Sequence, residues 1–361
     1  MHVLVVTVVH HPQDARILHR QIRALREAGH TITYAAPWLD TGAEPAAAEG
    51  LQVVDLPCAR GRRRVRALRA ARALIRRLGR EADLILLHDP ELLAAVAGLR
   101  LPVTVWDVHE DTAAALSDKP WLPPPARRPA RRLVRCAERA AERRLRLLLA
   151  ETHYQERFRR PHPVVPNETT VPDTVAGPGA DRVVYLGRLS VGRGAGELLA
   201  LPALLPSGVR LELFGPADDT VAADVAAAHK RGLLRWHGIV PNDRAVPALQ
   251  GALAGLSLLC DEANYRHSRP TKIVEYMACG VPAITTPNPV AADLVSRHGC
   301  GLVVPFDDPA AVAAALRRLH GDPGLRRDLG RRGHRAAQRD YDWRCSGRAF
   351  VAQLEAWAGL P

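Results

Sequence analysis

The chain has 361 residues, of which 47% are hydrophobic, and a formal net charge of +12, so it is long enough for two domains with buried cores. It contains no apolar run of the roughly 20 residues that a membrane-spanning helix needs, and its N-terminal stretch lacks the features of a signal peptide. Six widely spaced cysteines without a C-x-x-C pair argue against a structural zinc site and favour free thiols in a reducing cytoplasm.

In the first part of the chain, apolar runs alternate with amphipathic stretches. Continuous apolar strands separated by helices are typical of a parallel sheet that is covered on both faces. The expected strands are 2–9, 31–36, 51–56, 84–88, 103–107, 147–150 and 163–165. The expected helices are 14–28, 62–78, 91–99 and 129–146.

A segment rich in Pro, Gly and Thr, residues 161–181, precedes a second alternating series. Its expected strands are 182–186, 210–214, 234–237, 256–260, 282–285 and 301–304, with helices between them that end with 309–319 and 324–339. The sequence therefore predicts an α/β protein with two Rossmann-like, doubly wound domains facing a central cleft. The predicted parts are an N-terminal domain 1–165, a linker 166–181, a C-terminal domain 182–340, and a final helix within 341–361 that crosses back to the first domain.

Polar residues follow two strands of the first domain. The segment His10–Arg16 comes after the first strand, and Leu87–Glu91 comes at the end of the fourth. Because the carboxyl ends of parallel strands meet at one edge of the sheet, both segments are candidates for binding an acceptor. A helix cap by Asp14 is an equally good explanation of that residue. The candidate acceptor-binding residues are Gln13, Asp14, Arg16, His88 and Asp89.

The fifth strand also ends in polar residues: Asp107, His109, Glu110 and Asp111. His109 is the strongest catalytic candidate of this group, since chemistry in such sheets occurs at strand ends. The alternative is a hydrogen-bonded core histidine followed by a helix cap at Asp111.

In the second domain, the strand Val184–Leu186 leads into a loop with Gly187, Arg188 and Arg193. Glycine lets the backbone approach a phosphate, and arginine neutralises phosphate with forked donors. This signal is weak by itself, because many α/β turns need glycine.

The segment Ser268–Pro282 predicts a helix that starts after Pro270 and carries Lys272, one of only three lysines among 50 basic residues. Amides of Thr271, Lys272 and Ile273 at a helix start can hold a phosphate. Glu275 lies one turn after Thr271, where it can accept the hydroxyls of a ribose. The alternative is a surface ion pair between Lys272 and Glu275.

Positive charge is concentrated in 60–80 and 127–146. Such surfaces favour phosphates, nucleic acid or anionic lipid, and a solvated helix face is the simpler explanation. Aromatic residues are only 4% of the chain, which disfavours stacking on nucleic-acid bases. The sequence also lacks a G-x-G-x-x-G after the first strand, a Walker loop, a D-x-D at a strand end and a G-x-S-x-G. We therefore expect no nucleic-acid partner, no cofactor and no metal.

Taken together, these segments resemble the retaining, family-4 type glycosyltransferases of the GT-B fold. The resemblance runs from HHPQDARILHRQIRALREAGHTI through LGRLSVGRG and PTKIVEYMACGVPAITT to GCGLVVPFDDPAAVAAAL and the closing Tyr-Asp-Trp helix, which is almost the whole chain. It implies that the C-terminal domain binds a nucleotide sugar and that the N-terminal domain binds the acceptor.

The resemblance also implies roles for single residues. Arg188 and Arg193 would contact the diphosphate, Glu275 the ribose and His109 the donor sugar, while the turn that ends at Ile239 would flank the base. The catalytic set is His109, Glu275, Arg188 and Lys272, and the donor-binding set is Gly187, Arg188, Arg193, Ile239, His267, Thr271, Lys272, Ile273 and Glu275. Asp14 and Arg16 match a subgroup whose first loop reads D-x-R.

Two positions depart from the family pattern. His267 stands where the family has a second glutamate, which leaves the group that holds the sugar hydroxyls open. Asn288-Pro-Val290 replaces a paired glycine.

The resemblance implies a retaining, metal-independent transfer of a hexose from a nucleoside diphosphate sugar, UDP before others, to a hydroxyl of a natural-product or polysaccharide core or of a lipid-linked glycan. Two alternatives remain: a nucleotide-sugar 2-epimerase on the same fold, and a basic membrane-associated binding protein. The expected location is the cytoplasm, with peripheral contact to the anionic inner face of the membrane.

Overall fold

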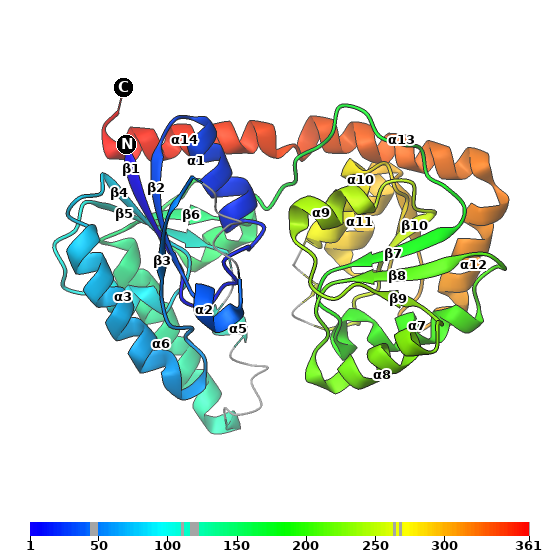
Figure 1. Cartoon of the computed structure of the whole chain (residues 1–361), viewed down its shortest axis with the longest axis horizontal. Coiled ribbons are helices and arrows are strands. Elements are labelled where there is room, and N and C mark those ends of the chain that lie inside the picture. Colours follow the sequence, from blue (N-terminus) through cyan, green and yellow to red (C-terminus); the bar gives the residue numbers. More distant parts are fainter. Residues whose placement is uncertain (44–49, 110–111, 116–122, 263–264, 267–268, 361) are drawn as a thin grey trace. The chain divides into compact units, whose positions relative to one another are not determined.

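The structure is a computed structural model that describes residues 1–43, 50–109, 112–115, 123–262, 265–266 and 269–360 (Figure 1). Its contacts divide the chain into two compact units. The first unit is Met1–Asn167 together with Cys345–Pro361, and the second unit is Glu168–Arg344. Among the described residues, no helix combines the length and apolar character that crossing a membrane requires.

The first unit contains a six-stranded sheet in the order β3-β2-β1-β4-β5-β6, and every pair in it is parallel. Its central strands are continuously apolar after His2 of β1, as expected for a sheet covered on both faces. The strands are β1 (His2–Val6), β2 (Thr31–Ala36), β3 (Gln52–Asp55), β4 (Leu84–Leu87), β5 (Val103–Val108) and β6 (Arg146–Leu149).

The helices of the first unit lie between these strands. Because β3, β4, β5 and β6 follow one another in one direction across the sheet, right-handed crossovers place α3, α4 and α6 on the same face. The helices are α1 (Arg23–Glu27), α2 (Trp38–Thr41), α3 (Arg64–Leu78), α4 (Leu92–Val96), α5 (Thr112–Ala115) and α6 (Pro124–Glu142), with a π-helical segment η1 (Ile17–Ile22) before α1.

Several predicted elements of this unit differ in the structure. The predicted strand 2–9 ends at Val6, and the predicted helix 14–28 consists of η1 and α1. Helix α4 ends at Val96, shortly before Gly98, whose φ of +72° stops a helix. Helix α6 starts at Pro124, since proline is tolerated in a first turn, where no backbone N–H is needed. Residues 163–165 form only an isolated bridge between Val164 and Leu149, not a seventh strand.

The second unit repeats the architecture with a parallel sheet in the order β12-β11-β10-β7-β8-β9. Two doubly wound α/β units, as predicted, are therefore confirmed. The strands are β7 (Arg182–Leu186), β8 (Arg210–Phe214), β9 (Arg235–Trp236), β10 (Ala254–Ser257), β11 (Ala283–Thr285) and β12 (Gly301–Val303). The helices are α7 (Ala195–Ala200), α8 (Asp219–Lys230), α9 (Asn242–Ala248), α10 (Thr271–Ala278), α11 (Pro289–His298), α12 (Pro309–Gly321) and α13 (Pro323–Asp340).

Most of the segment predicted as a linker lies within the second unit. The Thr169 amide hydrogen-bonds to the Tyr341 carbonyl, and the Gly179 amide to the Gly251 carbonyl at 3.0 Å. These bonds fasten the segment to the unit that it precedes in sequence, so the first connection between the units is at Asn167 and Glu168.

The chain ends with helix α14 (Trp343–Ala358), most of which belongs to the first unit. Phe350 and Leu354 are fully buried, and Glu355 lies 2.9 Å from His30 of the loop before β2. The chain therefore passes from the first unit to the second and back again.

Candidate active site

Helix α10 is held against the sheet of the second unit by Tyr276. Its hydroxyl donates to the Leu256 carbonyl of β10 at 2.9 Å and accepts from the Leu186 amide of β7 at 3.0 Å. Gly255 has no side chain to obstruct the Tyr276 ring, which a Cβ at that position would overlap. These contacts fix the first turn of α10 beside the loop that follows β7.

Lys272 lies in that first turn, and its side chain is 5% exposed. Its Nζ lies 3.7 Å from the centre of the Tyr185 ring, a cation–π contact. Nζ has no hydrogen-bond partner among the described residues. A Cβ on Gly187 would lie 3.5 Å from the same Nζ, so the ammonium is beside the backbone of the β7 loop. Gly187 has a φ of +122°, which other residues rarely adopt.

The burial of Lys272 disfavours its charged form. Burial, together with the charge of Arg193, lowers the pKa of Lys272 well below its usual value, and Glu275 opposes this shift only in part. A buried cationic donor without a partner is expensive for folding. It is the arrangement of a site that an anion completes.

Glu275 lies one turn further along α10 and is 5% exposed. Its Oε1 accepts a hydrogen bond of 3.1 Å from Asn242 Nδ2, at the start of α9. The surface ion pair considered from the sequence is therefore not what these residues form, because Lys272 and Glu275 are both buried. Asn242 was not predicted, because no spacing in the sequence links it to Glu275.

The two arginines of the β7 loop differ in their surroundings. Arg188 is 58% exposed and lies 2.6 Å from Asp218, so it is paired in this structure. Arg193 is half-buried at the end of a short 3-10 turn and hydrogen-bonds to Tyr265. Its charge acts on Lys272, which places both cations in one electrostatic environment.

The remaining predicted donor residues surround α10 and the end of β9. Thr271 opens α10, and the helix start has no side-chain cap, so no side chain of the cap occupies the amides of Thr271 and Lys272. Ile273 is fully buried, and its amide donates a hydrogen bond of 3.1 Å to the Pro270 carbonyl. Ile239 is 66% exposed in the loop after β9. His267 lies outside the described residues.

In the first unit, Asp107 is the centre of a buried polar network. Arg16 Nε and Nη2 each donate to its carboxylate at 2.7 Å, and Gln21 Nε2 donates at 2.9 Å. Burial opposes ionisation of Asp107, but the charge and hydrogen bonds of Arg16 hold its pKa well below the usual value. Arg16 was predicted to contact an acceptor; it is 3% exposed and forms this ion pair instead.

His109 extends from the same network toward the first loop. Its Nδ1 lies 3.5 Å from Asp107, and its Nε2 lies 2.8 Å from Nε2 of His10. One of the two facing nitrogens must carry the proton, since a nitrogen pair at this distance needs a donor. Burial lowers the pKa of His109, but the hydrogen bond and charge of Asp107 outweigh it and raise the pKa above its usual value. His10 was missed because its partner follows it by about a hundred residues.

His88 lies below this pair and is only 1% exposed. Its Nδ1 is 3.3 Å from Asp107, and burial lowers the pKa of His88. A cavity of about 10 Å³, room for about one water molecule, lies between His88, His109 and Pro90. His88 is thus beneath the surface where an acceptor would bind.

The other predicted acceptor residues hold the loop after β1. Asp89 is fully buried and accepts hydrogen bonds from Thr7 Oγ1 and the Val8 and Val9 amides, so it orders the loop instead of facing an acceptor. Asp14 accepts from the Arg16 amide at 2.8 Å, which is the cap considered as the alternative. Gln13 is half-buried beside it. Glu110 and Asp111 lie outside the described residues.

Among the described residues, two groups of side chains bring potential metal ligands within 4.8 Å of one another: His88, Asp107 and His109 in the first unit, and Glu197, Cys260 and Asp307 in the second. Asp107 already receives two hydrogen bonds from Arg16. In the second group, burial first and neighbouring acids next raise the pKa of Cys260, which disfavours the thiolate that a metal needs.

Two family models match the chain, one in each unit. The model described as Glycosyl transferase 4-like domain matches residues 15–173, and the model described as Glycosyl transferase-like matches residues 197–352. No curated protein sequence matches the chain.

Solved structures share the fold over nearly the full length. Sucrose-phosphate synthase from Thermosynechococcus elongatus has a TM-score of 0.71 at 18% identity, with 98% of each chain covered. HepE from Anabaena, in complex with UDP and glucose, has a TM-score of 0.70 at 15% identity, with 99% of this chain and 100% of that chain covered. WaaG, a glycosyltransferase involved in lipopolysaccharide biosynthesis, has a TM-score of 0.65 at 14% identity, with 98% and 99% covered.

The two domain matches and the two parallel, six-stranded sheets define a glycosyltransferase of the GT-B fold. Within that class, the chain belongs to the family-4 type, as the sequence resemblance indicated.

Proposed function

We propose that this glycosyltransferase moves a hexose from a nucleoside diphosphate sugar to a hydroxyl acceptor, with retention at the anomeric carbon and without a metal. The favoured donor is a UDP-sugar. The observation that carries the proposal is Lys272, a buried ammonium without a hydrogen-bond partner among the described residues. It lies beside Gly187 at the uncapped start of α10. A diphosphate supplies the missing counter-charge, and HepE has been solved with UDP and glucose.

The second unit provides the groups that a nucleotide needs. The amides of Thr271 and Lys272 and the Lys272 ammonium bind the diphosphate, and Arg188 and Arg193 add charge once Arg188 leaves Asp218. Glu275 accepts the ribose hydroxyls while Asn242 holds its carboxylate in place. The exposed Ile239 flanks the base, and His267 remains a proposed contact of the sugar.

The chemical demand of the transfer is the charge that develops on the departing diphosphate. Preorganised cations and helix-start amides stabilise that charge best in a dry site. His109 holds the donor sugar, with its ring oriented by Asp107, and the leaving phosphate helps to deprotonate the acceptor. Gln13, Asp14 and the other residues of the first loop shape the acceptor side. The six free cysteines fit a cytoplasmic location.

The donor site is tested with Lys272→Ala and Glu275→Ala. Thermal shift against UDP-, GDP-, ADP- and dTDP-sugars identifies the nucleotide, because a bound donor stabilises the folded protein. Both variants should lose the shift and most of the transfer, while Lys230→Ala, an exposed lysine on α8, keeps both. Full transfer in both site variants refutes the site.

The absence of a metal requirement is tested with EDTA, which should leave the transfer rate nearly unchanged. A complete loss of activity that magnesium restores would contradict this part of the proposal. Incubation with the nucleotide sugar alone should yield no epimer; an epimer would identify the enzyme as a 2-epimerase instead.

A further inference from the structure

The ring of His10, in the loop after β1, lies against the ring of His109. The two Nε2 atoms are 2.8 Å apart, and the ring centres are 4.6 Å apart with the ring planes tilted by 55°. The other nitrogen of the His109 ring, Nδ1, lies 3.5 Å from Asp107, which is long for a hydrogen bond. The contact with His10 is therefore the shorter of the two, and it holds the outer end of the His109 ring.

The backbone that carries His10 is fixed by the buried carboxylate of Asp89. Asp89 accepts hydrogen bonds from Thr7 Oγ1 and the Val8 amide, and Thr7 Oγ1 in turn accepts from the His10 amide at 3.1 Å. The side chain of His10 is 17% exposed and that of His109 is 10% exposed, so a ligand can reach both rings. The loop is thus ordered without a ligand, and the His10 ring has a defined position from which to hold His109.

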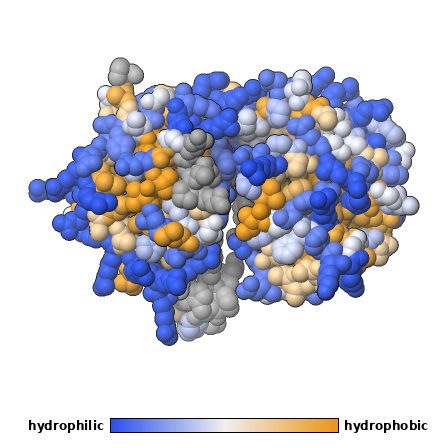
Figure 2. All heavy atoms as spheres, in the orientation of Figure 1, coloured by the Kyte–Doolittle hydropathy of each residue, from blue (hydrophilic) through white to orange (hydrophobic). Residues whose placement is uncertain are grey.

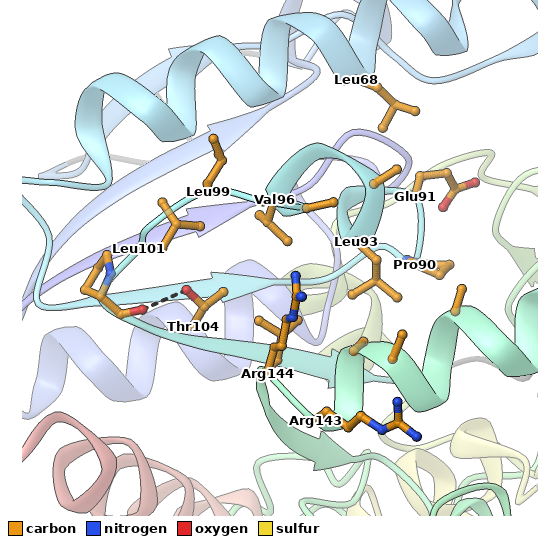
Figure 3. A pocket seen from close by; sticks show the side chains of 18 residues that line it. Leu68, Pro90, Glu91, Leu93, Val96, Leu99, Leu101, Thr104, Arg143 and Arg144 are labelled. Atoms are coloured by element: carbon orange, nitrogen blue, oxygen red, sulfur yellow. Dashed lines mark hydrogen bonds between the residues drawn. The ribbon is translucent and has the colours of Figure 1, made fainter.

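Packing alone does not fix the His109 ring on the side of His88. The cavity of about 10 Å³ leaves space there, and Pro90 lines it. Pro90 also lines a larger pocket of about 700 Å³, and Figure 3 shows the labelled side chains of Pro90 and Leu93 at the edge of that pocket. Because there is space on both sides of Pro90, this residue cannot press on the ring as a residue of a packed core would.

The short helix α4 is the reason for this loose packing. It has only five residues, and it leaves apolar surface of the first unit uncovered beside Leu93. Figure 2 shows hydrophobic residues exposed among hydrophilic ones on the visible face of this unit. The orientation of His109 therefore depends on polar contacts more than on the shape of its surroundings.

Two carboxylates face the His10 ring. Asp14 Oδ2 lies 3.9 Å from His10 Nδ1, and Asp89 Oδ1 lies 3.3 Å from His10 Nε2. Burial opposes ionisation of Asp14, but the charges of His10 and His109 and two amide hydrogen bonds outweigh it and lower the pKa of Asp14. The His10 side of the pair is therefore negative, which favours a positive charge on the rings.

The His109 side of the pair is closer to neutral. Asp107 is negative, but Arg16 forms a buried ion pair with it. His88 adds a ring whose centre is 5.8 Å from that of His109, and burial lowers the pKa of His88, so it remains uncharged. The Tyr154 hydroxyl donates to the His109 carbonyl at 3.4 Å and leaves the ring nitrogens to His10 and Asp107.

This geometry allows one proton between the two rings but not two. With one proton between the Nε2 atoms, one ring donates and the other accepts. A further proton can reside on His10 Nδ1, which faces Asp14, so the pair can carry one positive charge and keep its contact. If both Nε2 atoms carried a proton, two N–H groups would face each other at 2.8 Å, and the rings would separate.

We propose that His10 is a positioning residue of the transfer reaction. It shares one proton with His109 and holds the ring of His109 beside Asp107, so that His109 meets the donor sugar in one orientation and one protonation state. This inference rests on the proposed contact between His109 and the sugar, and it adds the residue that prepares this contact. At low pH both Nε2 atoms take a proton, the contact breaks, and transfer slows.

The shared proton is tested on the unliganded protein by nitrogen NMR of histidine rings labelled with ¹⁵N. We expect the signals of His10 and His109 to change together in two steps as the pH falls, because the two titrations are coupled. In His10→Gln, whose amide group places a polar atom near the position of Nε2, the His109 signals should change in a single step. Independent titration of the two rings in the unaltered protein would overturn the proposal.

The positioning role is tested by the release of UDP from UDP-glucose, with water as the acceptor, over a range of pH. His10→Ala should lower kcat about tenfold or more, because the His109 ring is no longer held. His10→Gln should recover most of the rate at neutral pH and should lose the decrease at acid pH. An unchanged rate in His10→Ala, or the same acid decrease in His10→Gln, contradicts the positioning role.

His2→Gln is the matched control. The His2 ring also makes polar contacts through both nitrogens, with Thr33 Oγ1 and the Glu81 carbonyl, but it lies at the start of β1. This variant should keep both the rate and its pH profile.

Failure of this inference is distinguishable from failure of the proposed function. The variants of His10 should keep the UDP thermal shift, because the proposed UDP contacts lie in the second unit. Loss of that shift in His10→Ala would indicate a general folding defect and would overturn the positioning role. If the unaltered protein shows no UDP shift and releases no UDP, the proposed donor site is refuted, and the NMR titration still decides whether His10 and His109 share a proton.

Discussion

At the scale of single residues, Lys272 is costly for the fold and necessary for the proposed function. Its ammonium is buried, contacts the Tyr185 ring and has no hydrogen-bond partner in the described part of the chain. A buried polar group without a partner costs about 1–3 kcal/mol in proteins. A residue of this kind is retained where a ligand satisfies it.

The first prediction follows from that cost. Lys272→Met keeps the length of the side chain and removes the unsatisfied ammonium, so the variant should unfold at higher denaturant concentration, by about 1–3 kcal/mol, while UDP binding is lost. Urea unfolding followed by circular dichroism measures the first effect and calorimetry the second. Lys230→Met, at an exposed site of α8, should change neither quantity. A destabilised Lys272→Met would show that the ammonium stabilises the unliganded fold.

The second prediction is that Lys272 takes up a proton when the donor binds. In the unliganded protein the pKa of Lys272 is lowered from 10.5, and a bound diphosphate raises it again. Between these two pKa values, donor binding takes up a proton, so affinity falls as pH rises, by up to about tenfold per pH unit. Calorimetry of UDP binding at mildly alkaline pH, in buffers of different ionisation enthalpy, counts the protons.

Whereas the affinity for the donor falls as pH rises, the folding stability of the unliganded protein should increase with pH. The unfolded chain keeps the Lys272 proton up to its pKa of 10.5, whereas the folded chain releases it at lower pH. The contribution of Lys272 to stability therefore rises with pH through that window and falls as pH decreases through the folded pKa. If UDP binding releases protons, or exchanges none, Lys272 is not the group that takes up a proton when the diphosphate binds.

The sequence alone predicted some residues of the candidate site and missed others. Lys272 and Gly187 were selected from a helix start and a strand–glycine turn, and the structure places them side by side. The pairs Asn242–Glu275 and His10–His109 depend on how distant elements pack, which residue patterns do not encode. Arg16 seemed available because nothing in a sequence shows that Asp107 is buried beneath it.

At the scale of elements, α10 is positioned chiefly by one side chain. The Tyr276 hydroxyl joins the helix to β7 and β10 through Leu186 and Leu256, and the ring packs on Gly255. Removing the hydroxyl leaves a buried amide and a buried carbonyl with one partner fewer.

Tyr276→Phe should therefore lower the free energy of unfolding by about 1–3 kcal/mol and weaken donor binding, because α10 loses its fixed register against the β7 loop. Urea unfolding and UDP titration measure the two effects. Tyr341→Phe, half-buried at the end of α13, is the control for loss of a phenolic hydroxyl and should spare UDP binding. Unchanged UDP affinity in Tyr276→Phe would show that the helix is positioned by packing alone.

The boundaries of helices and strands were predicted well where the hydrophobic periodicity is strong. They were predicted poorly where the conformation of a single residue ends the element. Strand β2 and helix α3 follow their apolar patterns, whereas β1, predicted as 2–9, ends at Val6. Helix α4 stops early because Gly98 adopts a positive φ, and the first part of the predicted helix 14–28 is the π-helical segment η1 instead of an α-helix. Such local outcomes depend on tertiary contacts more than on propensity.

At the scale of the whole molecule, each unit has its own sheet and its own hydrophobic cores. Separate cores allow separate unfolding transitions. The alternation of strands and helices was enough to predict two doubly wound units, because that pattern is repeated over many residues and tolerates local error.

Calorimetric unfolding should therefore show two transitions, of which UDP raises only the one that belongs to the second unit, because the proposed nucleotide contacts all lie there. With Glu275→Ala this shift should vanish while both transitions remain. A UDP-induced rise of both transitions together would show that the units unfold as one.

The route of the chain through its two units has a consequence for synthesis. Residues 168–344 are continuous, whereas the first unit is built from 1–167 and from the last helix, whose Phe350 and Leu354 are fully buried. During translation, the second unit can complete its core while the ribosome still holds the residues that complete the first. The unit that is synthesised first is therefore completed last, and a nascent chain that is released before α14 has been synthesised contains only one complete unit.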